Sequence, residues 1–508
     1  CPSRPDSRLS PLMVVKGRWQ VVPGKRQLPI SMNRRIIVIG GGISGLAAAH
    51  RLAELDREEK LGLEIHLLEA SHRLGGNIAT ERVGEFLVEA GPDSFITEKP
   101  WALRLCERLG LISRLISTST TNQNIYVVHK GSLRPLPEGF FLLAPTHLWP
   151  FIQTPLFSWK GKLRIACELF LPRGRIDGDE SLASFVRRRF GSEVLERVAQ
   201  PLIGGIYAAD PEQLSLSATM PRFLEMERAR RSVIWAMWSE QRRRSGKQRA
   251  GSGARWSLFV TLAGGMQELV DSISARLPTG NVHLGIKITG LNWDSGKKIW
   301  TATTSGNEKF DADGVILALP AYSAAQILSA LDPQVAQELG AIPYSSAGTV
   351  SLAYRLGDLP RGINGFGFVV PAAESRSIIA CTFSSIKYAG RAPAGHLLLR
   401  AFVGGAMQPQ LLKQDDATTE NSVRRELADL LAIKAEPLFC RIHRHTGSMP
   451  QYHVGHRERI ERIETHLAKL PALALAGNAY HGVGIADCIH SGEEAAERML
   501  LQLKIRTV

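Results

Sequence analysis

Three glycines near the start of the chain have the spacing that a dinucleotide site needs. Gly40, Gly42 and Gly45 form GxGxxG between a short apolar run and an Ala/Leu-rich stretch. In such a turn the first glycine permits the tight bend, the second lets the backbone approach a pyrophosphate, and the third allows close packing of helix on strand. Glu69 ends the next apolar run, where a carboxylate can accept hydrogen bonds from ribose hydroxyls. The spacing therefore predicts a bound dinucleotide.

An arginine follows that acidic residue at a place suited to a longer cofactor. Arg73 stands four positions after Glu69 and is followed by Gly75 and Gly76. Its guanidinium could form charge-assisted hydrogen bonds with a diphosphate. NAD enzymes do not usually need this second loop, whereas FAD is held along its whole length. We interpret the loop as an FAD contact, with an exposed salt bridge as the alternative role of Arg73.

Two further turns could meet a flavin ring. Gly91 and Pro92 form a turn that would bring backbone close to a flat ring, and Gly477, Asn478 and the glycine-rich segment 482–485 precede the last helix. The amide groups at a helix N-terminus can stabilise an anionic reduced flavin. Asp487 is interpreted as a helix-start residue rather than a catalytic base.

No other chemistry stands out in the sequence. A Ser/His/Asp triad, an HExxH motif and a clustered carboxylate pair are all missing, so no catalytic side chain is predicted. Four histidines cluster without metal-ligand spacing, and we predict no metal: His443, His445, His453 and His456. The six cysteines are scattered without CxxC spacing, which fits a reducing compartment. Cys488 is expected to be a buried helix residue, and the FAD to be non-covalent.

The elements that must position these residues lie in three separated stretches. The first is a βαβ unit; the second is a helix with several strands; the third is a strand, a glycine-rich turn and a long helix. Their expected elements are the strands 36–39 and 63–68 around a helix at 44–55, a helix from about 266, strands beginning near 282 and near 286, a strand at 314–319, and the last helix after 485. Together they predict one nucleotide-binding layer with inserted material.

We therefore expect a fold that is α/β and α+β: a discontinuous Rossmann-like FAD-binding domain, an antiparallel-sheet substrate domain and a helical insertion. The expected segments are 1–31, a disordered or mis-annotated extension; 32–100, 251–320 and 441–508, the three parts of the FAD-binding domain; 101–250, the helical insertion; and 321–440, the substrate-binding sheet. The insertion is expected to line a substrate channel or to face a membrane, and to end in a basic Gly/Ser-rich loop at 238–256.

The chain is basic, with 62 Lys and Arg against 48 Asp and Glu and a net charge of +14. This balance would suit nucleic acid, an anionic membrane or a polyanionic substrate, and charge alone does not choose among them. The uncharged run 139–159 is broken by three prolines, so a spanning helix is not expected. We interpret it as a hydrophobic wall of the helical domain or, alternatively, as a membrane-contacting surface or channel lip.

Longer motifs give the sequence a family resemblance. It resembles the FAD-dependent protoporphyrinogen and coproporphyrinogen oxidases of haem biosynthesis, within the amine oxidase and phytoene desaturase superfamily. The motifs are EAGPDSF (89–95), PLIGGIYAADPEQLS (201–215), LAGGMQEL (262–269), CTFSSIKYAGRAP (381–393), LLLRAFVGG (397–405), MPQYHVGH (449–456) and LAGNAYHGVGIADCIHSG (475–492). The last motif has Ala486 where the family usually has proline, which leaves its glycines intact.

The resemblance implies a set of site residues. The implied FAD contacts are Gly40, Gly42, Ile43, Ser44, Gly45, Glu69, Ala70, Arg73, Gly91, Pro92, Asp93, Ser94, Val282, Asn478, Val483, Gly484 and Ile485. The implied substrate-facing residues are Lys99, Val350, Phe368 and Tyr388. Flavin N5 is the implied hydride acceptor, so the reaction needs no protein base.

The implied activity is a six-electron oxidation with O2 as acceptor and H2O2 as product. The substrate would be coproporphyrinogen III, protoporphyrinogen IX or both, and the lysine at position 99 favours the tetracarboxylate coproporphyrinogen III. The alternatives are another flavin amine oxidase or phytoene desaturase-type enzyme, or a catalytically silent flavin-binding protein at a membrane. A cytoplasmic location is expected, with no nucleic-acid partner. Contact with the inner face of the membrane, a pathway neighbour such as a ferrochelatase, and oligomer formation stay open.

Overall fold

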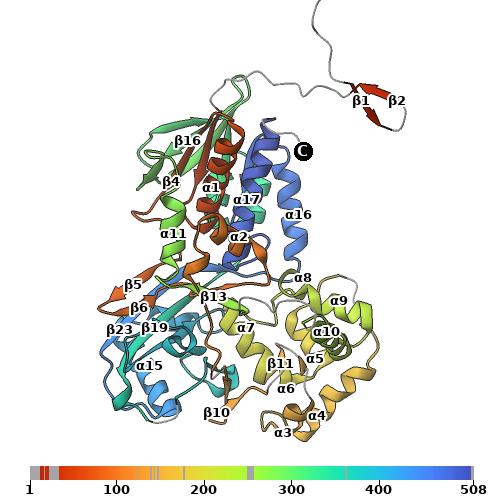
Figure 1. Ribbon diagram of the computed structural model, residues 1–508, viewed down its shortest axis with the longest axis vertical. Helices are drawn as coiled ribbons and strands as arrows, with labels where there is room; N and C mark the ends of the chain where they lie inside the picture. Colours follow the sequence, from red (N-terminus) through yellow and green to blue (C-terminus); the bar gives the residue numbers. More distant parts are fainter. Residues whose placement is uncertain are drawn as a thin grey trace, which may run out of the picture.

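The computed structural model describes residues 12–15, 18–21, 34–121, 123–137, 140–141, 144–145, 148–174, 178–248, 257–360 and 363–504. Figure 1 shows an upper body built on a sheet and its helices, with a large sheet at lower left and a group of helices at lower right. Most of the segment 1–31, which we interpret as an extension, lies outside the described residues. Within it, β1 (Leu12–Val15) and β2 (Arg18–Val21) pair with each other.

The upper body contains the parallel sheet that the glycine motif predicts. Its strand order is β14-β4-β3-β18-β24, and every neighbouring pair is parallel. The strands are β3 (Arg34–Ile39), β4 (Leu63–Glu69), β14 (Val282–Leu284), β18 (Gly314–Leu317) and β24 (Leu473–Leu475). Their side chains are buried on both faces: Ile36 and Val38 face one hydrophobic cluster, and Ile37 and Ile39 face another.

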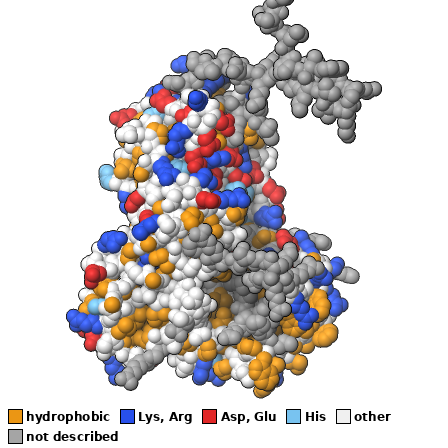
Figure 2. All heavy atoms as spheres, in the orientation of Figure 1, with side chains coloured by type: hydrophobic (Ala, Val, Ile, Leu, Met, Phe, Trp, Pro, Cys, Tyr) orange, Lys and Arg blue, Asp and Glu red, His pale blue; other side chains and the backbone are white. Residues whose placement is uncertain are grey.

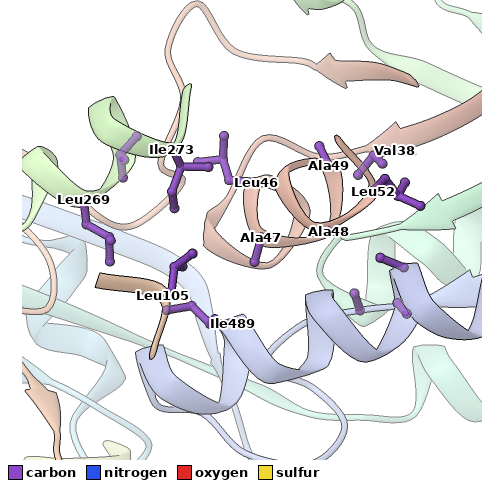
Figure 3. Packing of buried hydrophobic residues seen from close by; sticks show 14 of the residues in the cluster. Val38, Leu46, Ala47, Ala48, Ala49, Leu52, Leu105, Leu269, Ile273 and Ile489 are labelled. Carbon is purple, nitrogen blue, oxygen red and sulfur yellow. The ribbon is translucent and has the colours of Figure 1, made fainter. Parts of the chain in front are cut away.

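The first face is covered by α1 (Ile43–Glu59), α2 (Pro100–Arg108), α11 (Gln267–Ser274) and α17 (Ile485–Gln502). Figure 3 shows the small side chains of α1 against α17, with Leu105 and Leu269 completing the packing. A Cβ added at Gly492 of α17 would lie 2.1 Å from the carbonyl oxygen of Ser44. The two helices therefore approach so closely that only glycine fits at this crossing.

The second face is covered by a three-stranded antiparallel sheet and three helices. These elements are β15 (Ile288–Asp294), β16 (Ile299–Thr304), β17 (Lys309–Ala312), α12 (Ala321–Leu328), α13 (Pro333–Gly340) and α16 (His456–Leu467). Their apolar residues, including the fully buried Trp300, form one cluster with Ile37 and Leu317 of the parallel sheet. The upper body is thus a three-layer unit assembled from distant parts of the chain.

The lower sheet has seven strands in the order β10-β9-β20-β21-β22-β19-β23. They are β9 (Ile125–His129), β10 (Ser132–Pro135), β19 (Tyr344–Arg355), β20 (Gly367–Val369), β21 (Ala380–Phe383), β22 (His396–Gly404) and β23 (Phe439–Pro450), and α15 (Asp416–Leu431) packs against the sheet. All pairs are antiparallel except β9 with β20. The sheet therefore extends beyond the predicted range 321–440, because the distant strands β9 and β10 form one edge and β23 at the other edge continues to Pro450.

The lower helical group comprises α3 (Leu148–Gln153), α4 (Trp159–Ala166), α5 (Leu182–Arg189), α6 (Ser192–Val194), α7 (Gln200–Tyr207), α8 (Leu216–Thr219), α9 (Pro221–Arg230) and α10 (Val233–Gln248), with short turns η2 (Cys167–Phe170) and η3 (Leu195–Ala199). The prediction of a loop from 238 was wrong for its first part, since α10 continues to Gln248. Its Glu, Gln and Arg residues have good helix propensity, which outweighs their charge. Residues 249–256 lie outside the described part.

Short elements join the large bodies. The small sheets are β7 (Phe95–Ile96) with β13 (Phe259–Leu262) and β8 (Leu115–Ser117), β5 (Thr80–Val83) with β6 (Phe86–Glu89), and β11 (Phe140–Phe141) with β12 (Ala144–Pro145). The short helices are α14 (Ser384–Lys387), η1 (Ile112–Arg114), η4 (Leu356–Asp358), η5 (Ala372–Glu374) and η6 (Pro409–Lys413). The candidate site lies where these joining elements meet the carboxyl ends of the parallel strands.

Candidate active site

The glycine turn between β3 and α1 is shaped by three different constraints. A Cβ at Gly40 would lie 2.3 Å from the Ala318 carbonyl oxygen, and one at Gly45 would lie 1.9 Å from the Gly40 carbonyl oxygen. A Cβ at Gly42 would meet no atom within 4 Å. Gly42 is also the N-cap of α1 and has no side chain to cap the helix amides. The turn therefore offers free space at a helix N-terminus, which is what a diphosphate requires.

Glu69 closes the next strand beside this turn. Its carboxylate accepts hydrogen bonds from the amides of Gly41, at 2.5 Å, and Ser71, at 2.8 Å. Leu284 of β14 pairs with Glu69, so Val282 lies two residues back along the same edge. The backbone fixes the carboxylate at the end of β4, where a ribose would lie next to the pyrophosphate.

The loop after Glu69 folds back onto the glycine turn. The amide of Gly75 donates a hydrogen bond to the Gly41 carbonyl at 2.8 Å. Arg73 is exposed, and its guanidinium donates to the carbonyl oxygens of Leu74, Ile78 and Gly76 within the same loop. These contacts hold the Arg73 guanidinium in the loop that packs against the glycine turn. A bound diphosphate would compete with the three carbonyl oxygens for the N–H groups of Arg73.

The Gly91 turn is held from the lower sheet. A Cβ at Gly91 would lie 1.7 Å from the Asn77 carbonyl oxygen, so only glycine fits there. The carbonyl of Ala90 accepts hydrogen bonds from Thr349 Oγ1 at 3.0 Å and from His445 Nε2 at 2.9 Å. Arg400 donates to the carbonyl of Gly91. Side chains of β19, β23 and β22 thus fix the peptide groups of this turn.

Beyond the turn, Asp93 lies among cations. Its Oδ2 is 3.6 Å from Lys387 Nζ and 3.7 Å from Arg400 Nη1, and its Oδ1 accepts a hydrogen bond from Ser94 at 2.7 Å. Burial alone would raise the pKa of Asp93, but Lys387, Arg400, the Ser94 hydrogen bond and Arg391 together outweigh it and lower the pKa to about 2. Asp93 is therefore ionised at neutral pH.

The last glycine-rich loop is braced by one tyrosine. The hydroxyl of Tyr452 donates to the Asn478 carbonyl at 2.5 Å and accepts from the Gly482 amide at 2.9 Å. The loop leads into α17, whose N-cap is Gly484 and has no side-chain cap. A second helix N-terminus is thereby positioned by residues that follow the lower sheet, as the sequence pattern predicts for a flavin-facing turn.

Lys99 and Asp487 form an ion pair at this second helix N-terminus. Lys99 Nζ donates to both carboxylate oxygens of Asp487, at 2.6 and 2.8 Å. The side chain of Lys99 is 44% exposed, and that of Asp487 is 12% exposed. Asp487 lies in the first turn of α17, as expected for a helix-start residue, but its partner is Lys99. The charge of this lysine is therefore already compensated within the chain.

The other residues considered for chemistry have structural surroundings. Burial raises the pKa of the Cys488 thiol to about 12, so a reactive thiolate is disfavoured. Within the part of the chain that the structure describes, no group of three or more His, Cys, Asp or Glu side chains could hold a metal ion. His443 Nε2 lies 3.5 Å from Glu81, and His445 bonds the Ala90 carbonyl.

The four predicted substrate residues differ in exposure. Val350, Phe368 and Tyr388 are 0%, 2% and 1% exposed, respectively, and the first two belong to the packed core of the seven-stranded sheet. Lys99 alone among the four is accessible to a large extent. Val350, Phe368 and Tyr388 are thus buried within the chain, and their role toward a substrate stays a prediction.

Sequence reasoning missed four polar residues that face the Gly91 turn: Lys387, Thr349, Arg400 and His445. Their sequence signals were weak, since each lies in a strand or short helix of ordinary composition. His445 was considered only for metal-ligand spacing, although a histidine can equally donate to a backbone carbonyl. Lys387 and Arg400 lie within motifs that carry the family resemblance, and this was the available signal.

Comparisons with known proteins match the whole of this architecture. The model of the flavin-containing amine oxidoreductases matches residues 43–500. The chain is 37% identical over 471 residues to the coproporphyrinogen III oxidase of Bacillus subtilis (strain 168), covering 92% of this chain and 98% of that protein. It is 32% identical to the protoporphyrinogen oxidase of Bos taurus, over 92% and 99% of the two chains. A solved structure assigned as a protoporphyrinogen oxidase from Exiguobacterium sp. 255-15 superposes with a TM-score of 0.80 at 31% identity, covering 93% and 99%.

Proposed function

The chain belongs to the family of flavin-containing amine oxidoreductases, and from this premise we propose that it is an FAD- and O2-dependent porphyrinogen oxidase of haem biosynthesis. The proposed substrate is coproporphyrinogen III, with protoporphyrinogen IX as a second substrate. Some relatives are named coproporphyrinogen III oxidase and others protoporphyrinogen oxidase, and both kinds match this chain over nearly their full length. These relatives support the proposal.

The residues of the glycine turn fit FAD. The free space at Gly42 would accept the diphosphate, Glu69 would accept hydrogen bonds from the ribose, and the N-terminus of α17 would face the ring. We propose the remaining predicted contacts on the same basis: Gly40, Ile43, Ser44, Gly45, Ala70, Arg73, Gly91, Pro92, Asp93, Ser94, Val282, Asn478, Val483, Gly484 and Ile485. When bound, FAD supplies the hydride acceptor and is reoxidised by O2.

One observation carries the choice of an anionic substrate. Two partly exposed lysines, Lys99 and Lys387, lie beside the two turns that would meet the flavin ring. Porphyrinogens carry carboxylate arms, and lysine ammonium groups bind carboxylates. Coproporphyrinogen III has four such arms and protoporphyrinogen IX has two, so the former gains more from a site with several cations. We propose Val350, Phe368 and Tyr388 as the apolar side of that site.

The proposed reaction needs little from the protein beyond positioning. Removing a hydride from a methylene bridge between two pyrroles leaves a cation delocalised over both rings, and the pyrrole N–H protons can leave to water. Three such steps consume three O2 and release three H2O2 for each porphyrin formed. The rigid Gly91 turn, fixed by Thr349, His445 and Arg400, would orient the reacting bridge.

Product analysis tests this proposal directly. Anaerobically reduced coproporphyrinogen III and protoporphyrinogen IX are mixed with purified yellow protein in air, and porphyrin absorption, porphyrin fluorescence and H2O2 are followed. We expect both porphyrins to form, coproporphyrin III with the higher kcat/KM, and intact FAD to be released by heat denaturation. Formation of neither porphyrin by FAD-loaded protein would refute the proposal.

We further propose a place for the protein in the cell. No helix of the described residues is long and apolar enough to cross a membrane. The outer surface of α3, α4 and η2 nevertheless exposes Trp149, Trp159, Leu163 and Phe170 by 67 to 78% of their area. Figure 2 shows hydrophobic side chains gathered at the lower right, where Figure 1 has these helices. Such a surface supports peripheral contact with the cytoplasmic face of a membrane. An iron-inserting ferrochelatase is the proposed pathway neighbour that consumes the porphyrin.

A further inference from the structure

Lys387 and Lys99 differ in how their ammonium groups are satisfied. Both carboxylate oxygens of Asp487 accept hydrogen bonds from Lys99 Nζ. Lys387 Nζ lies 3.6 Å from Asp93, beyond hydrogen-bond distance, and makes no hydrogen bond to any residue that the structure describes. Its side chain is 17% exposed. Lys387 therefore keeps its donors available for a ligand.

The position of Lys387 is nevertheless well defined. It ends α14, and its carbonyl accepts a hydrogen bond from the Ser119 amide at 2.9 Å. Its Nζ lies 4.9 Å from the ring centroid of Tyr388 and 5.7 Å from that of Phe259. Phe259 is 40% exposed and pairs with Ile96, three residues before Lys99. The small sheet of β7, β13 and β8 thus carries the exposed ring of Phe259. Lys387, whose ammonium group makes no hydrogen bond, and the Lys99–Asp487 pair lie beside its strands.

The charges around Lys387 favour an added anion. Asp93 faces both Lys387 and Arg400, while Arg391 faces Glu89 at 3.7 Å. Three cations are therefore matched by two carboxylates. Burial raises the pKa of Glu89, so this carboxylate offsets the positive charge of the three cations less well. Arg391 Nη1 and Arg400 Nε are buried without hydrogen-bond partners in the described part of the chain. A carboxylate next to Lys387 would complete the charge balance.

We propose that Lys387 binds a carboxylate arm of the porphyrinogen, and that it contributes more than Lys99 to selection of the tetracarboxylate. This inference rests on the proposed function. The exposed ring of Phe259 would lie beside the apolar macrocycle while the arm reaches Lys387. Lys99 contributes less, because an incoming carboxylate must share its ammonium group with Asp487.

The test compares three lysine-to-methionine variants of the FAD-loaded protein: Lys387→Met, Lys99→Met and, as the control, the exposed Lys434→Met. The probes are coproporphyrin III, which keeps all four carboxylates, and its uncharged tetramethyl ester.

We expect Lys387→Met to raise the Kd for coproporphyrin III roughly tenfold, as loss of one ion pair of about 1.4 kcal/mol would. The Kd of the ester should not change, Lys99→Met should have a smaller effect, and Lys434→Met should have none. Lys387→Arg should restore binding.

Several outcomes would overturn the inference. Equal losses for the acid and the ester would mean that Lys387 acts only by balancing Asp93, and a larger effect of Lys99→Met would reverse the order of the two lysines. If Lys387→Met loses its flavin, the polar variant Lys387→Gln, which leaves Asp93 unchanged, must show the same selective loss. If wild-type protein binds coproporphyrin III through Lys387 but oxidises neither porphyrinogen, the proposed function fails while this binding site stands.

Discussion

Single residues of the glycine turn illustrate how one residue type can serve opposite physical needs. Gly40 and Gly45 are required because chain atoms already occupy the space of a side chain. Gly42 differs, since a Cβ there would meet no atom within 4 Å, and we propose that the cofactor needs that space. The GxGxxG spacing identifies all three positions, but only the structure separates the two glycines that packing requires from the one that has free space around it.

This difference leads to a prediction for Gly42→Val. The valine side chain would enter the space proposed for the diphosphate, and its Cβ would meet no atom of the folded chain within 4 Å. We therefore expect a folded, colourless protein that FAD does not reconstitute, as measured by flavin absorbance and circular dichroism. Gly357→Val is the matched control, because Gly357 is exposed and a Cβ added there would also meet no atom within 4 Å. Flavin retained by Gly42→Val would show that the turn is not the site.

A second prediction at this scale concerns Asp487. Because Asp487 neutralises Lys99, Asp487→Asn would free the ammonium group for a substrate carboxylate. We expect the KM for coproporphyrinogen III to fall, by up to about tenfold for about 1.4 kcal/mol of restored ion pairing. The double variant Lys99→Ala/Asp487→Asn should lose this gain. A KM that rises in Asp487→Asn would instead show that the pair supports the loop before α17.

At the scale of elements, the helix pair α1 and α17 carries a buried histidine. His50 of α1 is 1% exposed, and both ring nitrogens lack hydrogen-bond partners among the described residues. Burial lowers the pKa of His50 to about 4, although the Glu54 carboxylate, 3.7 Å away, opposes this shift. The neutral imidazole is therefore the form that fits at this site on α1, where Arg108 and Arg276 also disfavour a positive charge.

This burial predicts a loss of stability in mild acid. Above pH 6.5, His50 is neutral in both folded and unfolded chains. Between pH 6.5 and about 4 the unfolded chain binds a proton that the folded chain does not, so stability falls as the pH falls. The full loss is about 3 kcal/mol, from a pKa difference of 6.5 against about 4. We expect His50→Leu to reduce the drop in Tm between pH 7 and pH 5.

Two other histidines serve as comparisons for this variant. His456, whose pKa burial also lowers to about 4, remains in the variant, so part of the acid sensitivity should persist. His481→Leu serves as the control because its ring is 58% exposed, and it should retain the wild-type pH profile. An unchanged profile in His50→Leu would assign the acid sensitivity to other groups.

The sequence predicted local elements of the upper body better than long-range pairing. The strand before Gly40, the helix after it and the last helix begin within two residues of their expected starts, because an apolar run, an Ala/Leu-rich stretch and glycine-rich turns mark them locally. The edges of the seven-stranded sheet were missed, since the pairing of β9 with β20 depends on contacts between distant segments. The Lys99 and Asp487 pair was missed for the same reason.

At the scale of the whole molecule, the exposed apolar surface of α3, α4 and η2 lies at the end opposite the parallel sheet (Figure 1). Trp149 and Trp159 could enter a lipid headgroup region while Lys160 meets anionic lipid. The protein would then lie on the bilayer with the end opposite the parallel sheet.

Vesicle sedimentation tests this arrangement. We expect binding to vesicles that contain anionic lipid, weakened by salt and reduced at least fivefold in Trp149→Ser/Trp159→Ser, because each exposed indole is worth about 1 to 2 kcal/mol when buried. Leu356→Ser, at a 51% exposed position outside this surface, is the control. Sedimentation that does not depend on lipid at low salt would assign the surface to packing within the helical group.

The order of the strands in the parallel sheet has a consequence for how the protein is made. The glycine turn leaves the ribosome early, but its packing partners β24 and α17 are synthesised near the end of the described chain. At roughly 5 to 20 residues per second, the turn waits on the order of tens of seconds for the helix that crosses it at Gly492. If the glycine turn and the N-terminus of α17 bind the flavin as proposed, flavin loading has to wait until both segments have been synthesised.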